Sequence, residues 1–141
     1  MGGPLQGPMA GATGGRTPLL WAAAALAAVT GALHLYFAFA FFTAEPGLQV
    51  VFLGIGVVYL AGAALGLAGW RPDLVLKAAA GWVVLLIVTW GLGAAYGRTV
   101  NLEPLALADK AVEVALLVVL LLLIRARKAA APARVPPSGA T

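Results

Sequence analysis

Residues 48–70 read LQVVFLGIGVVYLAGAALGLAGW and contain no charged side chain. A helix needs about 20 mostly apolar residues to cross the roughly 30 Å hydrocarbon core of a bilayer, and this segment meets that requirement. The rest of the chain has the same character, because 62% of its residues are apolar and only 10% are charged, whereas a soluble domain carries about 25% charged residues. The sequence therefore predicts an integral membrane protein whose surroundings are the lipid bilayer.

Three further spans are predicted from the same pattern. Residues 19–42 and 74–96 are apolar stretches of similar length. The fourth is predicted over 104–124, because its uncharged part alone is too short to span and Pro104 suits a first helical turn. Short connectors make consecutive helices antiparallel neighbours. We therefore expect an all-α, up-down-up-down four-helix transmembrane bundle over residues 19–124.

The two ends of the chain differ from this bundle. Residues 1–18 are rich in Gly and Pro, and residues 125–141 are basic and then rich in Pro and Ala, so we expect flexible tails. Cytoplasmic segments carry excess Lys and Arg. With both termini and the second connector on one side, that side holds seven of the nine basic residues: Arg16, Arg71, Lys77, Arg125, Arg127, Lys128 and Arg134. We therefore expect a plasma-membrane protein with both termini cytoplasmic.

Four ionisable residues are the candidates for positions deep inside the predicted spans, in addition to Lys77 near the start of the third. They are His34, Asp109, Lys110 and Glu113. Such residues cost about 2.5–3.5 kcal/mol each on insertion scales and usually face the bundle interior, where they find partners. Helical rise places His34 level with Asp109 and Lys110, with Glu113 nearer the midplane. Tyr59, Thr89 and Trp90 reach similar depth on the second and third spans, so we expect them as lining residues of one polar cluster.

Two interpretations of this cluster stay open. In the structural one, Lys110 neutralises one carboxylate, His34 hydrogen-bonds the other, and the cluster fixes helix register. In the functional one, it is a proton relay, a polar ligand pocket or a metal site. One His with two carboxylates matches the ligand count of a facial triad, but Lys110 competes as a cation. A haem with two axial His residues needs more than the single His present. We therefore predict no metal and no other cofactor.

Two short motifs carry a resemblance. They are Gly31-Ala32-Leu33-His34-Leu35-Tyr36 and Asp109-Lys110-Ala111-Val112-Glu113. Together they resemble uncharacterised small four-helix integral membrane proteins of bacteria and archaea. The resemblance implies the same bundle, with the His, Asp, Lys and Glu of these motifs as signature positions, and it implies no activity.

Small residues predict close helix packing. Glycines recur at four-residue spacing, which lets helix backbones approach. We expect Gly31, Gly62, Gly66, Gly93 and Gly97 at such contacts, within the chain or against a membrane-protein partner or second copy.

Few function classes remain. The chain has no Cys, its single Ser is Ser138 in the tail, and no phosphate-binding or zinc-protease motif occurs, so an enzyme is not expected. The charges form no patch that would suit nucleic acid. The first hypothesis is a non-enzymatic subunit or scaffold of a membrane complex. The alternatives are a proton-linked transporter or ligand-binding bundle that uses the polar cluster, and a cofactor-bearing redox protein.

Overall fold

The chain is built from helices. A computed structural model describes residues 17–97 and 103–130, and within these ranges it contains four helices and no strand. The helices are α1 (Pro18–Ala40), α2 (Pro46–Ala68), α3 (Pro72–Ala95) and α4 (Pro104–Ala130). The first three are long and apolar enough to cross a membrane, and α4, which carries three charged residues in its first half, is not among them. The predicted all-α class with four helices is confirmed.

Every helix begins at a proline. Pro is tolerated in the first turn because its missing N–H has no intrahelical partner there. This places the starts of α1, α2 and α3 one or two residues before the predicted positions 19, 48 and 74. At the start of α1, the Thr17 side chain accepts a hydrogen bond from the backbone N–H of Leu20. At the end of α2, Gly69 adopts the left-handed conformation that terminates many helices.

The last helix extends beyond its predicted end at residue 124. It continues to Ala130 and so includes residues 125–130, which were predicted to belong to the basic tail. Cations near a helix C-terminus interact favourably with the helix dipole, and Arg127 and Lys128 occupy that last turn. Arg127 also lies 3.5 Å from Asp73 at the start of α3. The remaining tail residues, 1–16 and 131–141, lie outside the described ranges.

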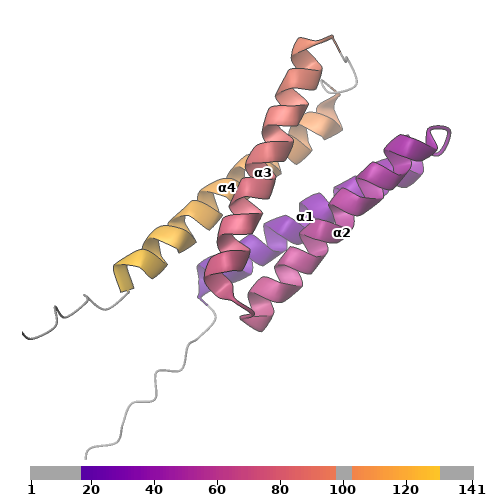
Figure 1. The fold of residues 1–141 in the computed structure, drawn as a ribbon. Coiled ribbons are helices and arrows are strands. Elements are labelled where there is room, and N and C mark those ends of the chain that lie inside the picture. The colour runs from indigo at the N-terminus through magenta and orange to yellow at the C-terminus, as the bar shows by residue number, and fades with distance from the viewer. Residues whose placement is uncertain (1–16, 98–102, 131–141) are drawn as a thin grey trace, which may run out of the picture.

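The helices form two pairs (Figure 1). One pair is α1 with α2 and the other is α3 with α4, and the pairs are joined mainly through contacts of α1 with α4. Contacts between the consecutive helices α2 and α3 are sparse, and α4 contacts α1 about as extensively as it contacts α3. In Figure 1 the pairs diverge toward the end that carries the turn 41–45 and the start of α4.

Between the pairs lies a small apolar core. It is made by residues of all four helices: Ala23, Ala27, Tyr59, Leu76, Ala80, Val83, Leu116, Leu120 and Leu123. Many larger apolar side chains point outward instead, with Phe39 63%, Val50 68% and Leu74 54% exposed. An outer surface of this kind is expected where lipid takes the place of water.

The closest helix approach is between α1 and α2. A Cβ added to Gly56 would lie 2.8 Å from the Leu35 side chain and 2.9 Å from the carbonyl oxygen of Gly31. Gly31 was expected at such a contact, but Gly56 was not. Among the described residues, a Cβ at Gly62 would meet no atom within 4 Å.

The other expected packing glycines serve different positions. A Cβ added to Gly66 would have one neighbouring atom, at 4.0 Å, so neither Gly66 nor Gly62 supports a close approach within the chain. Both line a cavity of about 520 Å³ whose wall includes residues of all four helices. Gly97 follows α3 in the left-handed region, with a φ of 81°, where glycine carries no steric cost.

Gly56→Ala is expected to destabilise the protein by about 1–3 kcal/mol, because the new methyl group overlaps a backbone oxygen that cannot move independently. Gly62→Ala makes the same chemical change in the same helix without overlap, and its higher helix propensity gives a neutral to slightly positive effect. Thermal unfolding of both variants in one detergent measures the difference. Equal melting temperatures for the two variants would show that the approach of α1 and α2 is not tight at Gly56.

Candidate functional site

Two buried carboxylates on α4 form the centre of the site. Asp109 is 1% exposed and Glu113 is fully buried. They are four residues apart, so they project from the same face of the helix, and that face is packed against α1 and α2. A buried charge is tolerated only where partners compensate it, so the surroundings of each oxygen decide whether this arrangement is stable.

Each carboxylate has one hydroxyl partner and one ammonium partner. The Thr30 hydroxyl of α1 donates to Asp109 Oδ1, and the Tyr59 hydroxyl of α2 donates to Glu113 Oε1 at 2.8 Å. The Lys110 Nζ lies 3.2 Å from Asp109 Oδ2 and donates to Glu113 Oε2 at 2.5 Å. Both oxygens of both acids are thus engaged, by groups from three helices.

His34 completes this cluster without a direct hydrogen bond to an acid. Its Nδ1 lies 2.9 Å from the carbonyl oxygen of Thr30, and because a carbonyl only accepts, Nδ1 carries the proton. Nδ1 is 3.8 Å from Asp109 Oδ1, and Nε2 is 4.0 Å from Glu113 Oε1. Both distances exceed the hydrogen-bond range. The expectation that His34 hydrogen-bonds a carboxylate is therefore corrected, since hydroxyl groups take that position.

The polar cluster is thus larger than the four predicted residues. It consists of Thr30, His34, Tyr59, Asp109, Lys110 and Glu113. Thr30 is fully buried and was not singled out from the sequence. A signal was present, because Thr30 is a polar residue one helical turn before His34, on the same face of an otherwise apolar helix.

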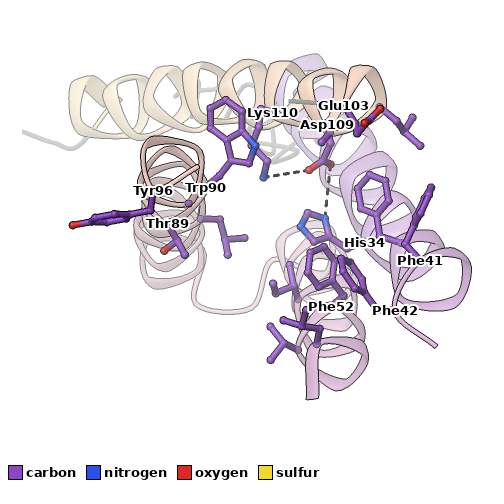
Figure 2. Close-up of a pocket in the computed structure, with 18 residues that line it drawn as sticks. His34, Phe41, Phe42, Phe52, Thr89, Trp90, Tyr96, Glu103, Asp109 and Lys110 are labelled. Carbon is purple, nitrogen blue, oxygen red and sulfur yellow. Dashed lines mark ion pairs between the residues drawn. The ribbon is translucent and has the colours of Figure 1, made fainter. Parts of the chain in front are cut away.

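A cavity of about 680 Å³ lies beside this cluster, between the two helix pairs. His34, Asp109 and Lys110 are on its wall, and Figure 2 shows their side chains converging at one side of it. The rest of the lining is largely aromatic and aliphatic, and Phe41, Phe42 and Phe52 lie beside His34 in the same view. Mostly apolar cavities with a few convergent polar groups are the usual form of ligand sites.

The predicted lining residues on α3 face this cavity rather than the cluster. Trp90 and Gly93 are on its wall, and so is Thr89, whose hydroxyl donates to the carbonyl oxygen of Leu85 in its own helix at 2.8 Å. Tyr96, also on the rim, is 85% exposed. Of the residues expected as lining, Tyr59 hydrogen-bonds an acid of the cluster.

A metal ion is one occupant to consider at the cluster. His34, Asp109 and Glu113 each offer a donor atom, and these atoms lie within 4.8 Å of one another. The Lys110 ammonium contacts both acids and thereby supplies positive charge where a metal ion would supply it. His34 is nearest to Asp109 Oδ1 and Glu113 Oε1, whereas Lys110 contacts Oδ2 and Oε2, so a divalent ion among the three donors would add positive charge next to that ammonium.

Thr30→Val is expected to destabilise the protein by about 1–3 kcal/mol, because the buried oxygen of Asp109 loses its donor while the shape of the side chain is kept. Thr89→Val is the matched control, since the Thr89 hydroxyl bonds only within its own helix turn in an exposed position, and its effect should stay within about 0.5 kcal/mol. Unfolding of both variants under one condition tests this. A Thr30→Val protein as stable as Thr89→Val would mean that the hydroxyl does not support Asp109.

Comparison of the chain with protein-family models, with curated proteins and with solved structures gave no match. The resemblance to small four-helix membrane proteins therefore stays a prediction from its two motifs. Any function must be argued from the cluster and the cavity themselves.

Proposed function

We propose that the chain is an integral membrane protein that binds a small ligand in the cavity beside the polar cluster, as a proton-linked transporter or ligand-binding bundle. The observation that carries the proposal is a buried, fully partnered pair of acids, Asp109 and Glu113, of which Asp109 lies on the wall of a large cavity. Ionisable residues inside a membrane are costly and mark functional sites more often than not. A cluster needed only for helix register would not require a cavity beside it.

The fourth helix is proposed to span the membrane with the other three. Its charged residues near the start, Asp109, Lys110 and Glu113, lie on the side packed against α1 and α2, with Lys110 only 13% exposed. Its outward positions are apolar, with Val114 and Val118 about half exposed. Lipid would therefore meet an apolar surface along this half of α4.

The proposed topology is antiparallel, up-down-up-down, in the plasma membrane. The contact of Arg127 with Asp73 supports it, because this contact brings the end of α4 to the start of α3. The cluster contacts support it at the other end, since the start of α4 meets the second half of α1. The excess of basic residues near the termini favours cytoplasmic ends.

The topology can be tested with cysteine probes, because the chain contains no native Cys. In intact cells, Ala44→Cys in the turn 41–45 is expected to react with a membrane-impermeant maleimide, because this turn is outside. Ala129→Cys at the end of α4 is expected to react only after permeabilisation. Labelling of Ala129→Cys but not Ala44→Cys in intact cells would reverse the proposed orientation, and labelling of both would refute the four-span topology.

A subunit role in a larger membrane complex is the second candidate. One observation favours it: α2 has only Gly56 and Tyr59 buried, and its Val50 and Val57 are 68% and 59% exposed. Such a helix offers room for another transmembrane helix to approach.

Native mass spectrometry of protein extracted gently from its own membrane distinguishes these candidates. We expect a small-molecule adduct on the wild type that is lost in Asp109→Asn, because this change removes a charge from the cavity wall. Asp73→Asn is the matched control, since the Asp73 side chain is 73% exposed and lies at the far end of the molecule, and it should keep the adduct. A stoichiometric protein partner without any adduct would instead favour the subunit role.

A further inference from the structure

We propose that the ligand of this cavity is an organic cation, an ammonium group attached to an apolar or aromatic body. This inference rests on the proposed ligand-binding function and adds the chemical class of the ligand. It draws on two independent observations, the charge balance at the polar cluster and the phenylalanine side chains of the cavity lining.

The charge balance leaves a deficit of positive charge. Lys110 is the only Lys or Arg among the described residues that line the cavity or form the cluster, and it contacts both Asp109 and Glu113. In a formal charge count that takes His as neutral, the two acids and one ammonium of the cluster leave one negative charge in excess. Glu103, at the start of α4, adds a further acid to the cavity lining. In a medium of low dielectric constant, such an excess strongly favours a cation over a neutral or anionic ligand.

The phenylalanine side chains of the cavity lining suit both the apolar part of such a ligand and its charge. Phe37, Phe41, Phe42 and Phe52 all line the cavity. They form a connected group, with ring centroids 4.5 Å apart for Phe42 and Phe52 and 6.1 Å apart for Phe37 and Phe52. Phe52 also stacks on His34 at 5.5 Å, so the aromatic wall reaches the polar cluster. Aromatic faces attract organic cations and bury their apolar groups.

The geometry explains how both parts of the ligand would be accommodated together. Asp109 and Lys110 come from α4, whereas the phenylalanines come from α1, α2 and the turn 41–45 between them. Figure 2 shows Phe41, Phe42 and Phe52 close to His34 and the acids Asp109 and Glu103, so a ligand between the two helix pairs would contact acids and rings together. The volume of about 680 Å³ is within the range of pockets for small organic molecules.

The test uses three probes that share a benzyl group and differ in the charge of a tetrahedral head. These are benzyltrimethylammonium, neutral neopentylbenzene and anionic phenylmethanesulfonate. Their binding to the full chain in lipid nanodiscs is measured by calorimetry, with empty nanodiscs subtracted. The cation is expected to bind at least about tenfold more tightly than the neutral probe, because both its charge and its contact with aromatic rings are favourable, and the anion is expected not to bind.

A pair of matched variants locates the effect in the cavity. Glu103→Gln removes an acid of the lining and is expected to weaken binding of the cation about threefold, with no effect on the neutral probe. Glu45→Gln makes the same change in the turn before α2, outside the cavity lining, and should leave both affinities unchanged. Both positions are exposed, so neither change threatens folding. Equal affinities of the two variants for the cation would contradict a contribution of the lining acid.

The lipid composition of the nanodiscs distinguishes two sources of the ammonium group, a lipid headgroup and a ligand dissolved in water. Nanodiscs keep a fixed fraction of phosphatidylglycerol, and the remainder is either an uncharged glycolipid or phosphatidylethanolamine. Weaker binding of benzyltrimethylammonium in the presence of phosphatidylethanolamine would support the same ligand chemistry and identify a lipid headgroup as its source. Equal binding in both would support a ligand that enters from water.

Two results would overturn the inference in different ways. If neopentylbenzene or phenylmethanesulfonate binds as tightly as the cation, the ligand class is wrong while the ligand-binding function stands. If none of the three probes binds above the level of empty nanodiscs, the cavity is not a ligand site and both proposals fail.

Discussion

Two carboxylates on one face of α4 must be compensated inside the protein, and the rest of the arrangement depends on how this is done. Neither acid can be left without partners in a low-dielectric interior. Thr30 fixes α1 against Asp109, Tyr59 fixes α2 against Glu113, and Lys110 joins the two acids from within α4. The positions of three helices are therefore coupled through a few polar atoms. Removal of one hydroxyl leaves a buried carboxylate oxygen without a donor, which is more costly than the loss of an ordinary apolar contact.

The two halves of the molecule are held together by different interactions. Toward the chain termini, small and aliphatic residues such as Ala27, Val83 and Leu120 form the core. Toward the turn 41–45, polar contacts hold α4 to the first pair, while α3 contributes only cavity lining there. Because α2 and α3 have few contacts, the space between the pairs is left open beside the cluster. The cavity thus lies where α2 and α3 have few contacts, beside the acids that hydrogen-bond side chains of α1 and α2.

The helices and the depth of most polar residues could be derived from the sequence. The side-chain partners depend on how each helix is rotated about its axis relative to its neighbours. Charge and hydropathy along the chain locate the helices, and a spacing of four places Asp109 and Glu113 together. Helical rise brings His34 to the same depth. Depth alone could not show that the Thr30 and Tyr59 hydroxyls, rather than the His34 ring, contact the acids. Gly56 was missed for the same reason, because glycine spacing on one helix does not reveal which glycine faces its neighbour.

In the proposed four-span topology, the location of the charges on the last helix has a consequence for biosynthesis. Helices leave the ribosome in chain order, so α1 and α2, which carry the hydroxyl donors, are made before α4. The acids then meet partners that are already in place, and α4 never needs to remain alone in lipid with three charges. A chain that stops before α4 leaves no acid stranded, whereas a chain with a damaged α1 leaves Asp109 without its donor. Defects early in the chain should therefore burden membrane quality control more than truncations at its end.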